Sequence, residues 1–151
     1  MTSYSDFDDR RIKHLELIQA VISRLGGNGF LVKGWALTVA GVFFGFSVES
    51  SNPLLAAVVV PMTALFWGLD SYFLRSEWLF RELYRQVSEL EPTLAPFFMA
   101  ATGKSFVERA KPRVRSRLAA FWSTTLRTYY GAILVAAALV VLVTVLGSSK
   151  A

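Results

Sequence analysis

The sequence predicts an all-α integral membrane protein with three transmembrane helices and cytoplasmic helical extensions. Three apolar segments, 31–48, 54–73 and 129–146, lead to this prediction. At about 1.5 Å per helical residue they extend about 27–30 Å, which matches the hydrocarbon thickness of a bilayer. The chain has 151 residues, and 54% of them are hydrophobic. The residues outside the apolar segments suffice for helical extensions but not for a separate catalytic domain, so we expect one membrane domain.

Basic residues are distributed unevenly around these segments. Five Lys or Arg lie in residues 1–33 and ten in residues 74–128, whereas residues 49–53 contain none and the tail has only Lys150. Because basic loops stay on the cytoplasmic side, this pattern predicts a membrane protein with its N-terminus inside and its C-terminus outside. Topology alone explains much of the net charge of +5, so this charge is weak support for a nucleic-acid partner.

Residues 1–29 are expected to form a cytoplasmic amphipathic helix. Its apolar residues recur at helical spacing, at Ile12, Leu15, Ile18, Val21, Ile22 and Leu25. An acidic start at positions 6, 8 and 9 does not fit a cleaved signal peptide, so the first span is retained. The glycine cluster that contains Gly26 and Gly27 is expected to stop this helix and to form a hinge before the span.

The second span, 54–73, is followed by no helix breaker, so we expect one helix that continues to about residue 91. Pro92 and Pro96 would end it. Within the span, Pro61 removes a backbone hydrogen bond and predicts a kink, which is either structural or a gating hinge.

Residues 92–128 are predicted to form a cytoplasmic basic loop and a helix that leads directly into the third span, 129–146. An apolar stripe supports that helix, at Val114, Leu118, Phe121, Trp122 and Leu126.

Small residues form stripes along the first two spans and predict where helices meet. The first span has Gly34, Thr38, Gly41 and Gly45 on one face, and the second has Ala57, Pro61, Ala64, Gly68 and Ser71. A weaker stripe in the third span comprises Ala132 and Ala136. Such faces let two backbones approach closely, either between the spans of one chain or between subunits of a homo-oligomer.

Ionisable residues lie near the cytoplasmic ends of the spans. Lys33 begins the first span, Asp70 is near the end of the second, and Arg127 precedes the third. An ion pair between Lys33 and Asp70 is the simplest interpretation, with Arg127 able to share the carboxylate. Such a pair either fixes helix register or belongs to a charged ring at the inner mouth of an oligomeric pore.

Residue types needed for catalysis are nearly absent. The chain has one histidine, His14, and no cysteine. Because a lone histidine lacks partners for acid–base catalysis, we interpret it as a solvated or interfacial residue. Residues 101–105 read ATGKS and resemble the end of a phosphate-binding loop, but the required earlier glycine is missing and no strand precedes them. We therefore expect no enzyme activity, no metal and no cofactor.

The segment 104–117 contains six basic residues and one acidic residue, Glu108. One interpretation is juxtamembrane charge that sets topology and binds anionic lipid headgroups. The other is a receptor for a phosphorylated ligand or short oligonucleotide, in which Phe106 stacks on a base. The basic residues are Lys104, Arg109, Lys111, Arg113, Arg115 and Arg117.

A basic start to a Gly-rich span, VKGWALTVAGVFFG, is followed by a short outer loop. The second span then runs into an amphipathic helix, FWGLDSYFLRSEWLFRELY. Over residues 8–90 this arrangement resembles the SLATT-type effectors of bacterial antiviral systems, small membrane proteins found with nucleotide-synthesising defence enzymes. The resemblance implies a membrane channel or pore that harms the infected cell when a nucleotide signal changes. The third span departs from the two-span pattern of that family.

These observations lead to two hypotheses from different classes. The first is a homo-oligomeric inner-membrane channel or pore-forming effector of antiphage defence, gated through its cytoplasmic helices. Its expected partners are the lipid bilayer, further copies of the chain, a nucleotide or oligonucleotide signal and a cytoplasmic defence protein. The second is a passive membrane anchor or scaffold that recruits a cytoplasmic partner.

Overall fold

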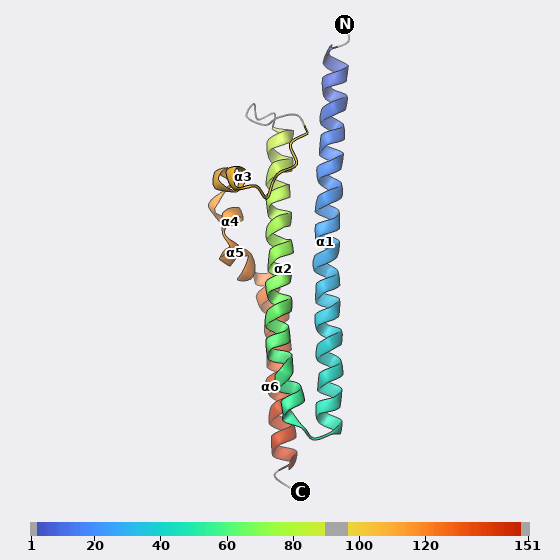
Figure 1. Ribbon diagram of the computed structural model, residues 1–151, viewed down its shortest axis with the longest axis vertical. Coiled ribbons are helices and arrows are strands. Elements are labelled where there is room, and N and C mark those ends of the chain that lie inside the picture. Colours follow the sequence, from blue (N-terminus) through green and yellow to red (C-terminus); the bar gives the residue numbers. More distant parts are fainter. Residues whose placement is uncertain (1–2, 90–96, 149–151) are drawn as a thin grey trace. The chain divides into compact units, whose positions relative to one another are not determined.

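The computed structural model of the protein describes residues 3–89 and 97–148, and these residues form helices without any strand. The all-α prediction is therefore confirmed. Three of the helices are long and apolar enough to cross a membrane, as predicted (Figure 1). The elements in order are α1 (Ser3–Glu49), α2 (Pro53–Ser88), α3 (Lys104–Arg109), α4 (Pro112–Arg115), α5 (Arg117–Phe121) and α6 (Thr124–Ser148).

The helices pack into two compact units. Unit 1 comprises Met1–Asn28 and Tyr72–Ala120, and unit 2 comprises Gly29–Ser71 and Phe121–Ala151. Helices α1 and α2 contribute residues to both units. The predicted spans 31–48 and 129–146 fall in unit 2, and the predicted cytoplasmic helices fall mainly in unit 1.

The prediction that the glycine cluster stops the first helix is wrong. Helix α1 runs through Gly26 and Gly27 without interruption (Figure 1). A glycine inside a helix costs about 1 kcal/mol relative to alanine, but unlike proline it keeps its N–H donor. Buried side chains on both sides of the cluster, Ile22 and Val32, hold the helix in place by packing. The cluster nevertheless contains the boundary between the two units in α1.

Helix α2 begins at a well-defined cap. The side chain of Asn52 accepts a hydrogen bond from the Leu54 N–H at 3.1 Å, and Pro53 occupies the first helical position, where its missing N–H has no cost. The helix then continues without a break to Ser88, with Pro61 inside it. The continuous helix predicted from the second span is thus confirmed as far as Ser88. Its predicted end near residue 91, with Pro92 and Pro96, lies outside the described residues.

The expectation of one helix leading into the third span is also wrong. The chain forms short helices α4 and α5 and starts α6 anew at Thr124. Two serines mark the starts, because Ser116 Oγ accepts from the Ala119 N–H at 3.2 Å and Ser123 Oγ accepts from the Leu126 N–H at 3.4 Å. Serine competes for backbone hydrogen bonds in this way and favours helix starts over helix interiors.

Unit 1 has a continuous hydrophobic core. Its fully buried members come from α1, α2 and the 101–110 segment, namely Ile18, Ile22, Leu79, Leu83, Ala101, Phe106 and Ala110. Partly buried side chains, including Val114 of α4, pack against this core. The amphipathic faces predicted for residues 1–29 and for the end of the second helix therefore meet in the same core.

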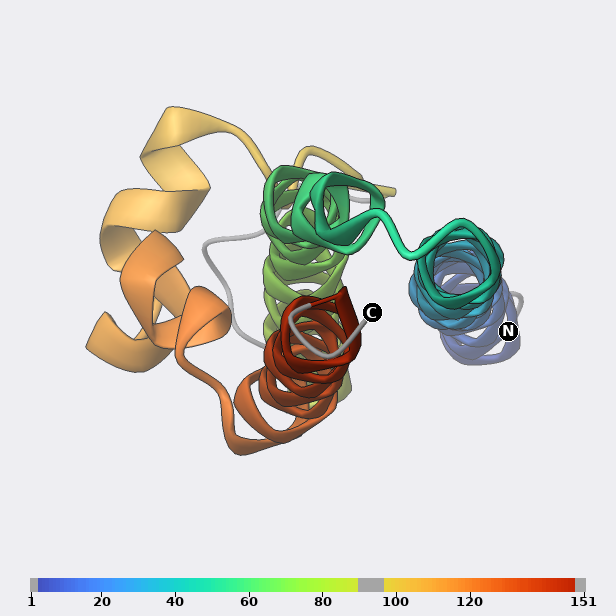
Figure 2. The same cartoon turned by 90° about the horizontal axis from the view of Figure 1, so that it is seen from below.

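Unit 2 is built from the predicted spans and has a core of small residues. Both views show α6 alongside the unit 2 part of α2 (Figure 1, Figure 2). Close packing between the helices is possible because the buried positions are mostly alanine, valine and small polar residues. They are Val32, Ala36, Ala40 and Ser47 of α1, Ala56, Val59, Thr63 and Asp70 of α2, and Leu126, Tyr130, Ile133, Ala137 and Thr144 of α6.

Candidate functional site

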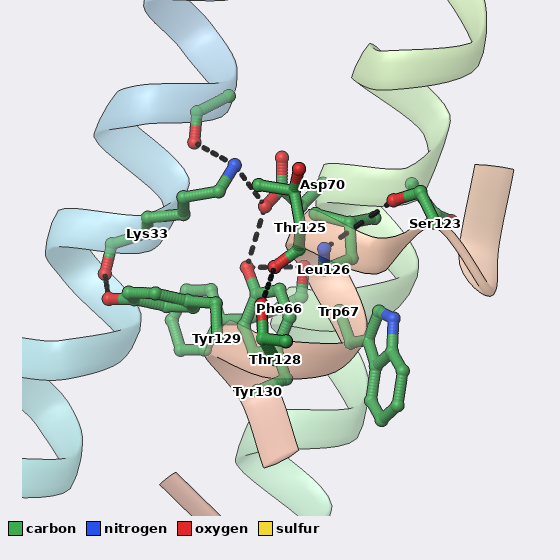
Figure 3. Close-up of polar contacts among 12 residues, drawn as sticks. Lys33, Phe66, Trp67, Asp70, Ser123, Thr125, Leu126, Thr128, Tyr129 and Tyr130 are labelled. Carbon is green, nitrogen blue, oxygen red and sulfur yellow. Dashed lines mark hydrogen bonds and ion pairs between the residues drawn. The ribbon is translucent and has the colours of Figure 1, made fainter. Parts of the chain in front are cut away.

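The structure contains the ion pair expected between the first two spans. Lys33 Nζ of α1 lies 2.6 Å from Asp70 Oδ2 of α2 (Figure 3). The Asp70 side chain is only 2% exposed, whereas that of Lys33 is 24% exposed. Lys33 Nζ also lies 3.4 Å from the Gly29 carbonyl, one helical turn earlier. The ammonium therefore faces both the carboxylate and the backbone of its own helix.

Two tyrosines of α6 complete this site, and sequence reasoning missed both of them. The Tyr130 hydroxyl lies 3.1 Å from Asp70 Oδ2 and 3.3 Å from the Phe66 carbonyl, so it hydrogen bonds to α2 (Figure 3). The Tyr129 hydroxyl donates to the Lys33 carbonyl at 2.7 Å. Adjacent residues of one helix thus reach two different helices. Their position at the start of an apolar segment, where tyrosine is common at membrane interfaces, was the available signal.

Trp67, three residues before Asp70, connects α2 to the start of α6. Its indole N–H donates to the Phe121 carbonyl at 2.9 Å, and its ring stacks on that of Phe121 with centroids 4.5 Å apart. The Tyr130 ring lies nearly parallel to the indole at 5.8 Å. Tyr130 therefore has an apolar contact at its ring and a polar contact at its hydroxyl, which together define its position against Asp70.

Gly29 allows α1 to approach the carboxylate closely. A Cβ atom at this position would lie 3.1 Å from Asp70 Oδ1, closer than an ordinary van der Waals contact. Asp70 Oδ2 is already bound to Lys33 and Tyr130, so the carboxylate cannot move freely away. The absence of a side chain at Gly29 is therefore part of the site.

Arg127 is not part of this site. Its side chain is exposed, and within the described residues no ion pair joins it to Asp70. The expectation that Arg127 shares the carboxylate is therefore wrong. Tyr130, about one helical turn further along α6, hydrogen bonds to Asp70 Oδ2 instead. The arrangement links three helices through one carboxylate and is suited to holding their register rather than to acid–base catalysis.

The small faces predicted for helix packing point away from the other helices of the chain. At Gly34, Gly41 and Gly45 a Cβ atom would meet nothing within 4 Å, and Thr38 is exposed. These residues lie roughly 100–160° around the helix from the buried Ala40, given about 100° per residue. Packing of the first two spans through this glycine face within one chain therefore does not occur in this structure.

The stripe on the second span behaves in the same way. Ala64 and Pro61 are exposed, and a Cβ atom at Gly68 would again meet nothing within 4 Å. The faces used inside the chain contain Ala36 and Ala40 on α1 and Ala56 and Val59 on α2.

The basic segment 104–117 is divided among three short helices. Lys104 and Arg109 are exposed at the two ends of α3, and Arg117 is exposed at the start of α5. Burial and the nearby Arg117 guanidinium lower the pKa of Arg75. The Arg115 side chain lies outside what the structure describes. Lys111 and Arg113 line a concave surface, which is a groove shared with α2.

Two aromatic or titratable residues are placed differently from expectation. Phe106 is 2% exposed within the unit 1 core, so it is not available to stack on a base. His14 is 5% exposed, with its Nε2 3.0 Å from the Phe98 carbonyl, so of the two expected placements, solvated or interfacial, the solvated one is wrong. The ATGKS segment contains a buried Ala101, and its last two residues begin α3, a helix of six residues.

No protein-family model matches the chain, and no curated protein or solved structure matches it significantly.

Proposed function

We propose that this protein is a three-pass, homo-oligomeric effector of the bacterial inner membrane that conducts ions and is controlled through unit 1. The resemblance of residues 8–90 to SLATT-type antiviral effectors supports this function. The proposal places residues 31–48, 54–73 and 129–146 in the bilayer, with the N-terminus inside and the C-terminus outside.

The main support for membrane insertion is the outward-facing apolar surface of the long helices. In the most apolar 18-residue stretch of each of the helices α1, α2 and α6, only 22% of the residues are buried. Large side chains such as Trp35, Leu65 and Leu139 are more than half exposed. Monomeric soluble proteins rarely expose contiguous apolar surface of this extent, whereas a bilayer covers it.

The open small-residue faces support assembly between copies. Gly34, Gly41 and Gly45 allow another backbone to approach closely, since among the described residues a Cβ atom at any of them would meet nothing within 4 Å. Lipid provides little hydrophobic drive for helix association, so close backbone packing is the main source of affinity. The exposed faces of α1 and α2 therefore support contacts between subunits.

In this proposal the pair of Lys33 and Asp70 holds the helices of one subunit together. Its carboxylate faces Lys33 and Tyr130 inside the chain, and not the outer surface. A charged ring at a pore mouth would require this pair to separate and the carboxylate to reach water.

The experiment is induction of the protein in bacteria while membrane potential is recorded with a potential-sensitive dye. A channel depolarises the cells, and Gly41→Leu abolishes this effect while the protein still inserts. Gly147→Leu is the matched control, because it makes the same change in another long helix where the added Cβ also meets nothing within 4 Å. Unchanged potential with correct insertion contradicts conduction and favours the anchor function.

A further inference from the structure

A groove of about 400 Å³ lies in unit 1 between α2 and the 111–114 segment. On α2 its lining residues follow helical spacing and occupy one face of the helix. Neither the sequence patterns nor the proposed conduction accounts for this face. The lining residues are Trp78, Arg81, Glu82, Arg85, Lys111, Arg113 and Val114.

Two consecutive side chains of the 111–114 segment, Arg113 and Val114, contact the rest of unit 1. Val114 packs against the unit 1 core, and Pro112 starts α4. The Arg113 guanidinium lies over the Trp78 ring, 5.6 Å from its centroid. A cation at this distance from an indole face is attracted by the ring electrons, which positions the guanidinium at the groove.

The acidic residue of the groove is already satisfied. Glu82 is buried and accepts hydrogen bonds from Arg85 at 2.7 Å and from Gln86 at 3.2 Å. The Arg85 hydrogen bond is the main cause that lowers the pKa of Glu82. Arg81 likewise forms an ion pair with Glu77 at 2.7 Å. The charges on the face of α2 that lines the groove therefore nearly cancel.

Lys111 and Arg113, the two basic residues that line the groove opposite α2, differ from Arg81 and Arg85 in their ion pairing. Lys111 and Arg113 are exposed, and within the described residues neither lies within ion-pair distance of a carboxylate, while the charge of Lys111 helps to lower the pKa of Glu82 from across the groove. They flank Pro112 and face the groove together with Trp78. An ammonium and a guanidinium that line the same concave surface suit a phosphate group, which accepts several charge-assisted hydrogen bonds.

The position of the groove along α2 also fits a phosphate at a membrane surface. Trp78 is five residues beyond the predicted end of the span at residue 73, which corresponds to about 7.5 Å of helix. The headgroup region is about 5–8 Å thick on each side of the hydrocarbon layer. Tryptophan is enriched at this depth, where its ring and N–H contact different environments.

We propose that Lys111, Arg113 and Trp78 form a binding site for a phosphate group, either of a phospholipid headgroup or of a soluble phosphorylated ligand. The site uses the groove specifically and not the total charge of residues 104–117. Its depth relative to the bilayer rests on the proposed membrane insertion, whereas binding of a phosphate to the groove does not rest on conduction.

The test compares two double variants of the full-length protein that remove the same charges. Lys111→Ala with Arg113→Ala changes the groove, and Lys104→Ala with Arg109→Ala removes one lysine and one arginine outside it. Native mass spectrometry counts phosphatidic acid retained from mixed micelles, and tryptophan fluorescence follows titration with inorganic phosphate. Retention of α-helical circular dichroism establishes that each variant is folded, and Lys111→Ala alone tests the groove without altering the contact of Arg113 with Trp78.

We expect the groove variant to weaken binding by about tenfold or more, as for loss of two charge-assisted contacts, and the control to change it by less than twofold. Groove-dependent retention of phosphatidic acid alone identifies a lipid headgroup as the source, and groove-dependent binding of inorganic phosphate identifies a soluble one. Equal losses in both variants, or no binding of either probe, overturn the proposed site. Neither result depends on membrane potential, so this site and the proposed conduction fail separately.

Discussion

Asp70 of α2 links its own helix to the two other long helices of unit 2. Its carboxylate is buried and contacts Lys33 of α1 and Tyr130 of α6. A buried ion pair adds little net stability, because desolvation offsets the attraction, but removing one partner leaves an uncompensated charge. The consequence of a mutation at this site therefore depends on whether both partners change together.

A double-mutant cycle with Lys33→Met and Asp70→Leu tests this coupling. Each single change is expected to lower the free energy of unfolding in detergent by about 3–5 kcal/mol, and the double variant by clearly less than their sum. Chemical unfolding followed by circular dichroism gives the four values. Additive losses would show that the two side chains do not interact in the folded protein.

Gly27 and Gly29 are two residues apart in α1 and should respond differently to alanine. Gly27→Ala is expected to raise the free energy of unfolding by about 0.5–1 kcal/mol, because alanine is the better helix former and its Cβ meets nothing within 4 Å. Gly29→Ala gains the same propensity but places a Cβ 3.1 Å from Asp70 Oδ1, so it should give no stabilisation or a loss. Equal stabilisation by both changes would argue against the close approach at Asp70.

The sequence alone predicts the ion pair of Lys33 with Asp70 but not which residues surround it. The pairing of Lys33 with Asp70 could be predicted because ionisable groups in apolar segments need partners. Arg127 is expected beside them only because it directly precedes the third span in the sequence, but its side chain is exposed. The role of Tyr130 depends on the rotation of α6, which is determined by stacking on Trp67 and is not visible in a hydropathy pattern.

Among the elements, α1 and the connection before α6 show where periodicity misleads. The apolar period in α1 is interrupted by glycines that suggest a stop, yet packing on both sides maintains the helix. Before α6, an uninterrupted apolar stripe suggests one helix, yet Ser116 and Ser123 cap two separate ones. In both places local hydrogen bonds or tertiary packing decided the outcome, and the apolar pattern alone contained neither.

Helix α2 beyond the second span should show a specific dependence on pH. Hydrogen bonds from Arg85 hold the pKa of Glu82 below its ordinary value of 4.5. A carboxyl whose pKa is lower in the folded state stabilises the protein above its unfolded pKa and loses this contribution as pH falls through the folded value. The wild type should therefore unfold at a higher temperature than Glu82→Gln at neutral pH. This difference should shrink below about pH 4.5.

Thermal melts from pH 3 to pH 7, followed by circular dichroism, measure this difference. Glu108→Gln is a suitable control, since Glu108 is an exposed acidic residue of the same unit. A difference between the wild type and Glu82→Gln that stays constant with pH would contradict the role assigned to the Arg85 contacts.

At the scale of the whole molecule, the small-residue faces lead to a prediction about assembly. Gly41→Leu or Gly45→Leu should reduce the size of the purified complex in detergent, because each adds a side chain to a face proposed for contact between subunits. Size-exclusion chromatography with light scattering measures this mass. Gly147→Leu should leave it unchanged, and native mass for all three variants would mean that the glycines face lipid.

The composition and period of the sequence were sufficient for the all-α class and for three helices long enough to span a membrane. They were not sufficient to show which face of each span packs inside the chain. Glycine and alanine stripes are both compatible with close packing, and only the arrangement of three helices in unit 2 assigns Ala36 and Ala40 to the inside and Gly41 and Gly45 to the outside.

We propose that the three long helices cross a membrane and that unit 1 lies on the cytoplasmic side. Reporter fusions that are active on only one side of the inner membrane determine where each loop and terminus lies. Fusions after Ser51 and Ala151 should report an outside location, and a fusion at Gly103 an inside location, as the distribution of basic residues predicts. An inside signal at Ala151 would show that α6 does not cross the membrane and would refute this topology.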